Sequence, residues 1–232
     1  MTNQPMTAVP ARSGTSWIVR TVRAVGWTLI LTGVLILLYL VYLLFFTGLQ
    51  TGAAQGELLN TWELEFGAVD DALPGEPGED GAPVDPVSPG DAYAALWFER
   101  DGERIVHDDA LFVIEGTSLE DLKRGPGHYS DSQAPGQEGN FAVAGHRTTY
   151  GQPFYNLDQL AAGDEVHVVD RDGRKWVYEV REQRIVSPHD VWVVDPDPFG
   201  EGGYWLTLTT CHPRWSAAQR LIVFAELTTE ST

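Results

Sequence analysis

The sequence predicts a mainly β fold: a closed or nearly closed barrel of about eight strands with short helices, preceded by one transmembrane helix and an acidic linker. Two observations support the barrel: short apolar runs recur from residue 92 onward, and turn-forming residues separate them. A third supports the membrane helix, an uncharged apolar stretch near the N-terminus. We therefore divide the chain into 1–26, 27–46, 47–91 and 92–232.

The apolar stretch at 27–46 has the length of a membrane span. At about 1.5 Å rise per residue it extends roughly 30 Å, the thickness of a bilayer hydrocarbon core. Residues 1–50 contain three arginines, all before the stretch, and no acid. The positive-inside rule then predicts a cytoplasmic tail at 1–26 and an extracytoplasmic position for everything after the span. A cleaved signal peptide is the alternative, but its apolar region usually has only about 7–15 residues.

Residues 47–91 are predicted as a membrane-proximal segment followed by an acidic linker. Residues 56–66 carry enough apolar residues for a short helix near the membrane surface, although their spacing is irregular. Residues 67–91 combine prolines, glycines and acids with almost no bulky apolar side chain. Such a composition cannot bury enough surface to fold, so a flexible linker is expected.

From residue 92 onward the chain alternates between strand-like runs and turns. The runs are 94–98, 110–114, 141–144, 165–169, 176–180, 184–186, 191–194, 204–210 and 221–227. The Asp172-Gly173 pair predicts a hairpin turn, and 118–123 and 154–160 are typical of single helical turns. We expect these runs to form the barrel domain, residues 92–232.

The charge of the chain excludes one class of partner. Its net charge of −18 argues against nucleic acid, because phosphate binding needs a basic surface. No metal site is predicted, since one cysteine and scattered histidines lack the close spacing of ligand sets. No cofactor is predicted either.

Cys211 is the only cysteine in the chain and lies near the end of a predicted strand. Because side chains alternate along a strand, Leu206 and Leu208 share one face, whereas Thr207, Thr209 and Cys211 share the other. The thiol is therefore on the polar face and has no partner for an internal disulfide. A reactive cysteine is favoured over an inert core residue.

A reactive thiol needs a base or a cation nearby, and two residues are candidates. His146 directly follows the strand at 141–144 and opens a polar loop, where catalytic groups usually lie. His212 is next to Cys211 in sequence, but consecutive strand residues point apart. Arg220 begins the last strand, and its guanidinium is suited to stabilising an oxyanion. The structural alternatives are a turn cap for His146 and a surface ion pair for Arg220.

Five short blocks of sequence occur in a recognisable order. They are EGTS at 115–118, GPGHY at 125–129, AGHRTTYG at 144–151, TLTTC at 207–211 and RLIV at 220–223. The last two resemble the signature of sortases, the cysteine transpeptidases of Gram-positive cell surfaces. The first three are similar to the class E subgroup, found mainly in high-GC actinobacteria. The resemblance covers roughly residues 93–228 and implies an eight-stranded sortase-type β-barrel.

The resemblance also implies roles for individual residues. Cys211 would attack the Thr–Gly carbonyl of a Leu-Ala-x-Thr-Gly type sorting signal and form a thioacyl enzyme. His146 would protonate the departing amine and deprotonate the incoming one, and Arg220 would stabilise the oxyanion. Tyr129 and Thr209 are the expected substrate contacts.

The implied partners are secreted proteins with a C-terminal sorting signal, a lipid-linked peptidoglycan precursor that supplies the acceptor amine, and the membrane. This describes a housekeeping sortase. A pilus-assembling sortase that uses a pilin lysine is one alternative. A non-catalytic, membrane-anchored β-barrel for adhesion or scaffolding is another. L,D-transpeptidases fit less well, since their cysteine lies in a Gly-Cys-Arg-like context shortly after a histidine.

Overall fold

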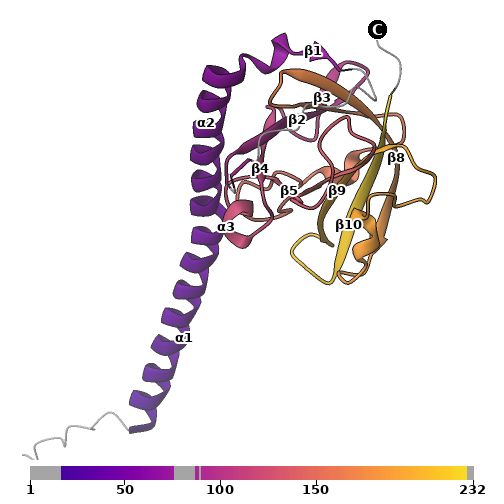
Figure 1. Ribbon diagram of the computed structural model, residues 1–232. Coiled ribbons are helices and arrows are strands. Elements are labelled where there is room, and N and C mark those ends of the chain that lie inside the picture. The colour runs from indigo at the N-terminus through magenta and orange to yellow at the C-terminus, as the bar shows by residue number, and fades with distance from the viewer. Residues whose placement is uncertain (1–16, 76–86, 89, 229–232) are drawn as a thin grey trace, which may run out of the picture. The chain divides into compact units, whose positions relative to one another are not determined.

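A β-barrel makes up most of the second of two units into which the chain divides, Met1–Tyr42 and Leu43–Thr232 (Figure 1). This computed structural model describes residues 17–75, 87–88 and 90–228. The strands are β1 (Leu73–Pro74), β2 (Ala92–Arg100), β3 (Glu103–Ile105), β4 (Leu111–Glu115), β5 (Gly127–His128), β6 (Gly139–Ala144), β7 (Glu165–Val169), β8 (Arg174–Val186), β9 (Tyr204–His212) and β10 (Gln219–Leu227). The helices are α1 (Trp17–Val41), the π-helical η1 (Tyr42–Phe46), α2 (Thr47–Phe66), α3 (Leu119–Leu122), and the 3-10 turns η2 (Val69–Asp71), η3 (Leu157–Gln159) and η4 (Val191–Val194).

The helix α1 is the one described element that is long and apolar enough to cross a membrane. It has 25 residues and none of them is buried. It begins ten residues before the expected span at 27–46 and includes Arg20 and Arg23. Arginine is a good helix former and its long side chain extends toward water, so charges near one end do not stop the helix.

Eight strands close into a ring in the order β2, β4, β5, β6, β9, β10, β8, β7. The ring closes because β7 pairs with both β2 and β8. Two of the ring pairs are parallel, namely β4 with β5 and β6 with β9. The other ring pairs are antiparallel. β1 and β3 attach outside the ring, to β8 and β2. The predicted eight-stranded barrel is confirmed.

Three of the predicted strands differ from the structure. The runs at 176–180 and 184–186 form one long strand, β8. The run at 191–194 is the 3-10 turn η4, which buries Val193 against Ile222 and Phe224 on the outer face of β10. A run of four apolar residues does not distinguish a strand from a buried turn by periodicity. The eighth ring strand is β5, whose two residues are too few to give a strand pattern.

The expected short helix at 56–66 begins nine residues earlier, as α2. Its buried residues are Thr47, Thr51, Leu58 and Trp62, and the last two join a second hydrophobic cluster with residues of β2 and β4. The buried face is polar in its first half, which explains the irregular apolar spacing in the sequence. α2 therefore belongs to the folded unit, which starts before residue 92.

The predicted linker at 67–91 is only partly described. Leu73 and Pro74 pair with Arg174 and Lys175 at the start of β8, so the first part of this segment is attached to the barrel. Residues 76–86 and 89 lie outside the described residues.

Candidate active site

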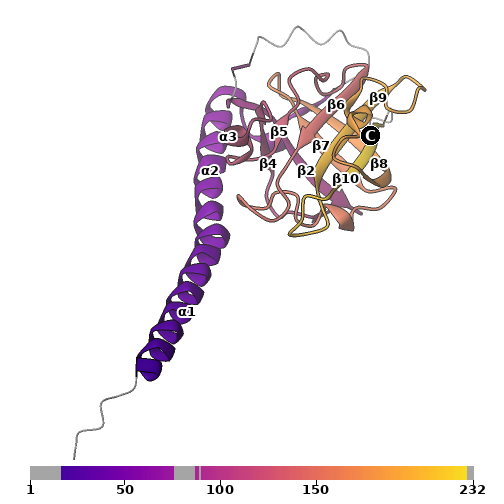
Figure 2. The same cartoon turned by 90° about the horizontal axis from the view of Figure 1, so that it is seen from below.

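The predicted catalytic residues belong to three neighbouring strands or to the loop directly after one of them: β6, β9 and β10, which lie side by side in Figure 2. β6 and β9 run parallel with Ala144 opposite Thr209. The ladder ends there, and His146 is two residues after Ala144 just as Cys211 is two residues after Thr209, so continuation of this register would place the two level with each other. On the other side Arg220 of β10 is the direct antiparallel partner of Cys211, a position with Cβ atoms about 4.5–5.5 Å apart. Cys211 and Arg220 are thus direct neighbours, and His146 follows the strand on the other side of β9.

The side chains of β9 alternate as the sequence predicts. Leu206 and Leu208 lie in the core inside the ring. The opposite, outer face is covered at Ile222 and Phe224 by η4. This cover ends before Cys211, whose thiol is free and partly exposed. The thiol is accessible from outside the barrel and is not a core group.

His146 is half-buried beside the loop that it opens. Its Nδ1 lies 3.5 Å from Thr149 Oγ1, and its ring faces the ring of Tyr150 at a centroid distance of 4.9 Å. Burial lowers the pKa of His146 below its ordinary value, because the imidazolium is disfavoured away from water. Among the described residues no carboxylate pairs with this ring to offset that effect.

Arg220 is half-buried, and its Nη1 donates to the carbonyls of Ala217 and Gln219 at 3.1 and 3.0 Å. Within the described part of the chain no carboxylate forms an ion pair with it. The surface ion pair considered from the sequence is therefore absent there, and the positive charge remains available to an oxygen of a substrate.

Tyr129 and Thr209, the expected substrate contacts, lie side by side. The Tyr129 hydroxyl is 3.3 Å from Thr209 Oγ1, and Thr209 is two residues before Cys211 on the same face of β9. Beneath them His128 is buried, with Nδ1 2.8 Å from Glu115 Oε2 and Nε2 3.0 Å from Ser132 Oγ. This buried chain of hydrogen bonds holds the segment that carries Tyr129.

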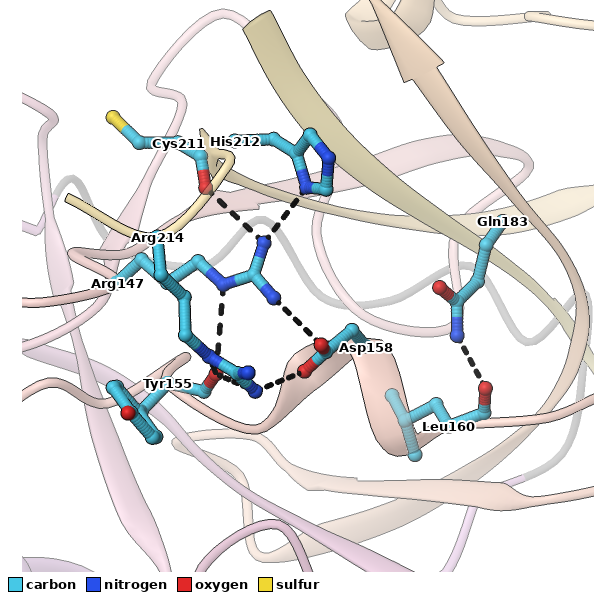
Figure 3. A network of polar contacts seen from close by, with 8 residues as sticks. All are labelled: Arg147, Tyr155, Asp158, Leu160, Gln183, Cys211, His212 and Arg214. Atoms are coloured by element: carbon cyan, nitrogen blue, oxygen red, sulfur yellow. Dashed lines mark hydrogen bonds and ion pairs between the residues drawn. The ribbon is translucent and has the colours of Figure 1, made fainter. Parts of the chain in front are cut away.

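A buried guanidinium that the sequence analysis did not single out, Arg147, lies beneath Cys211 (Figure 3). Its Nη2 is 3.0 Å from Asp158 Oδ2, and its Nη1 donates to the Cys211 carbonyl at 3.4 Å. Nη1 also lies 3.0 Å from His212 Nδ1, which must accept because arginine has only donors. Arg214 binds the other oxygen of Asp158 at 2.7 Å. His212 thus faces away from the thiol, as strand alternation predicts.

A cluster of two carboxylates and one histidine lies on the outer face of β2 and β7, and its hydrogen bonds disfavour a metal ion there. Ligand atoms of Glu99, Glu165 and His167 lie within 4.8 Å of one another. His167 Nε2 is 2.8 Å from Glu165 Oε2, whereas its Nδ1 is buried without a partner. The tautomer that satisfies both facts has its proton on Nε2 and donates it to Glu165. A metal at Nε2 would move that proton to the unpartnered Nδ1, which is unfavourable.

The chain has clear relatives among known proteins. A family model described as "Sortase domain" matches residues 107–228, more than half of the chain, and this range includes Cys211, His146 and Arg220. The chain belongs to the sortase family. This sortase is 32% identical over 222 residues to Sortase SrtE1 of Streptomyces coelicolor, covering 90% of this chain and 57% of that protein. It therefore spans less than two thirds of that relative's length.

Solved structures agree with the fold. Sortase E from Streptomyces avermitilis is 39% identical, with a TM-score of 0.53 over 61% of this chain and 90% of that chain. A Sortase D5 transpeptidase from Clostridium perfringens is 27% identical, with a TM-score of 0.59 over 76% of this chain and 99% of that chain. This sortase therefore has the sortase-type β-barrel that its motifs imply.

Proposed function

We propose that this sortase is a cysteine transpeptidase with Cys211 as its nucleophile. The register that joins the ends of β6, β9 and β10 is the observation that supports it most directly. The Cys211 sulfur bonds to the substrate carbonyl carbon as the C–N bond breaks, and the thiol proton passes through His146 to the leaving amine. A second amine then attacks the thioester, gives its proton to His146, and the thiol is restored.

Arg220 supplies the positive charge for the tetrahedral intermediate. It is adjacent to Cys211 across the β9–β10 pair and, among the described residues, has no carboxylate partner. A guanidinium there would donate to the oxygen on which negative charge develops. Removal of one such donor typically lowers kcat by about 10²–10³.

The substrate we propose is a sorting signal of the Leu-Ala-x-Thr-Gly type, cleaved between Thr and Gly. Likeness to sortase E proteins supports this class. Sortase E1 of Streptomyces coelicolor, 31% identical to this chain, has been solved with a tripeptide in its active site. The paired hydroxyls of Tyr129 and Thr209, the latter two residues before Cys211 on β9, are the polar contacts that we propose for the peptide.

The helix α1 is proposed to anchor the enzyme with its N-terminus in the cytoplasm and the barrel outside. Secreted proteins with a C-terminal signal would then reach the site, and a lipid-linked peptidoglycan precursor would supply the amine. A pilin lysine as acceptor, or a non-catalytic adhesion or scaffold module, are the competing functions.

The test uses the full chain in detergent, a quenched Leu-Ala-x-Thr-Gly peptide and an excess of either a small amine or a lysine-containing peptide. Mass spectrometry should detect cleavage after Thr and the amine-ligated product with the wild type, and neither with Cys211→Ala. Arg220→Lys should lower kcat by about 10²–10³. Arg181→Ala is the matched control, because Arg181 pairs with Glu226 on the barrel surface.

Product formation by Cys211→Ala would overturn the proposed nucleophile. Failure of the wild type on this peptide and on its Leu-Pro variant would overturn the proposed activity. Binding without cleavage would favour the non-catalytic module, and ligation to the lysine peptide alone would favour the pilus-assembling alternative.

A further inference from the structure

The loop that follows His146 has an unfavourable backbone conformation at its tip. Tyr150, Gly151 and Gln152 have φ values of +50°, +72° and +54°. Residues other than glycine rarely adopt this left-handed region, and they stay there only where neighbouring structure holds them. The ring of Tyr150, from this tip, lies against the His146 ring at 4.9 Å. The conformation of the tip therefore determines what faces His146.

The helix α2 contacts this tip directly. Thr47 is buried, donates its hydroxyl to the Leu43 carbonyl and accepts the Tyr150 N–H at 3.4 Å. One turn further, Thr51 packs on Gly151 so closely that a Cβ at Gly151 would come within 2.8 Å of Thr51 Cγ2. Two threonines on one face of α2 thus contact two of the three left-handed residues.

The same face of α2 is firmly attached to the barrel. Thr51 donates to the Lys123 carbonyl at 2.6 Å. The Gln55 side chain accepts from Phe112 N–H at 2.8 Å and donates to the Phe112 carbonyl at 2.9 Å, as a neighbouring strand of β4 would. Further along α2, Trp62 is buried in the second hydrophobic cluster, against residues of β2 and β4. Figures 1 and 2 both show α2 along β4 and α3. The helix behind the loop is therefore attached to the barrel by both hydrogen bonds and buried apolar contacts.

We propose that Thr47 is a positioning residue that acts through Tyr150 to hold the His146 imidazole in the orientation that the proposed reaction at Cys211 requires. This inference rests on the proposed transpeptidase function. It makes α2 part of the catalytic unit, although α2 lies outside the residues matched by the sortase domain model. Because Thr47 touches neither thiol nor imidazole, its effect is on the orientation of His146 and not on peptide binding.

The test compares four forms of the full chain in detergent: wild type, Thr47→Val, Thr47→Ser and Thr61→Val. Thr47→Val keeps the side-chain shape and removes the hydroxyl, Thr47→Ser restores the hydroxyl, and Thr61 is exposed on the same helix. Thr47→Val should lower kcat about three- to tenfold, as expected for one lost hydrogen bond, with KM unchanged. Thr47→Ser and Thr61→Val should retain wild-type kcat.

A second readout does not need activity. In a Cys211→Ala background, NMR of ¹³C-labelled histidine rings should show a shifted His146 signal in Thr47→Val and an unshifted one in Thr61→Val. A wild-type signal and wild-type kcat in Thr47→Val would overturn the proposal, as would a loss that Thr47→Ser does not rescue. If the wild type itself is inactive, the proposed function fails, while the ring signal still decides whether Thr47 positions His146.

Discussion

At the scale of single residues, the protonation of His146 follows from its surroundings. The imidazole is half-buried against Tyr150, and the described residues offer it no carboxylate. Burial therefore lowers the pKa of His146 below 6.5, and the neutral ring predominates at neutral pH.

This can be measured in Cys211→Ala, where no thiol titrates beside the ring. The His146 resonance should titrate with a midpoint below 6.5. Since the unfolded chain binds this proton more readily than the folded one, the free energy of unfolding should also decrease as pH falls below 6.5. A midpoint at or above 6.5 would contradict the assignment of a buried, unpaired imidazole.

At the scale of elements, the ends of β6 and β9 are fastened together below the candidate catalytic pair. Gly145 N–H donates to the Thr209 carbonyl at 3.0 Å, and Thr210 Oγ1 donates to the Gly145 carbonyl at 2.7 Å. Arg147 adds a bond from the loop after β6 to the Cys211 carbonyl. The positions of the thiol and the imidazole along their chains are thus coupled through backbone atoms.

We expect Asp158→Asn to destabilise this region. The guanidinium of Arg147 is 2% exposed, so removing its carboxylate leaves a buried charge poorly compensated. Breaking a buried pair costs about 3–5 kcal/mol, and because Asp158 is itself partly exposed we expect about 2–3 kcal/mol. Urea unfolding followed by tryptophan fluorescence measures the change.

The control for this prediction is Glu226→Gln, which removes the surface partner of Arg181. Exposed pairs of this kind contribute at most about 1 kcal/mol. Equal losses in Asp158→Asn and Glu226→Gln would show that the Arg147 pair is no more important than a surface pair.

At the scale of the whole molecule, the net charge is −18, and Glu115 and Asp164 are two carboxylates whose partners lower their pKa. Burial alone would raise the pKa of Glu115, but hydrogen bonds from His128 and Ser130 lower it below 4.5. Burial likewise opposes ionisation of Asp164, and its hydrogen bonds with Arg100 and Ala161 lower its pKa below 3.8. The Glu115 pair stabilises the folded state at pH above 4.5, and the Asp164 pair does so at pH above 3.8. Each contribution is lost as pH falls through the folded-state pKa of that carboxyl.

We therefore expect the free energy of unfolding to fall steeply with acidification below pH 4.5. Glu115→Gln should make that decrease shallower, because its side chain no longer takes up a proton on unfolding. The exposed Glu138→Gln serves as control. Urea titrations above and below pH 4.5 compare the slopes, and identical slopes for Glu115→Gln and wild type would contradict the prediction.

Local pattern was sufficient for much of the fold. The apolar run of which residues 27–41 lie in α1, the hairpin turn at Gly173 and the first residue of β2, Ala92, all follow from residues close together in the sequence. Local pattern did not predict the contacts that polar side chains make with the barrel. The first half of α2 contacts the barrel through polar side chains: Thr51 and the partly buried Gln55 donate to its carbonyl groups, and no hydrophobic period marks such a face.

For the candidate site, the sequence by itself identified residue types and strand ends: a lone thiol on a polar face, a histidine after one strand and an arginine at the start of another. Only the tertiary structure decided which of them meet and what supports them. Arg147 and Cys211 are 64 residues apart, and Thr47 and Tyr150 are 103 apart. Such contacts arise from strand pairing and helix packing, and since neither leaves a periodic signal in the chain, no local pattern predicts them.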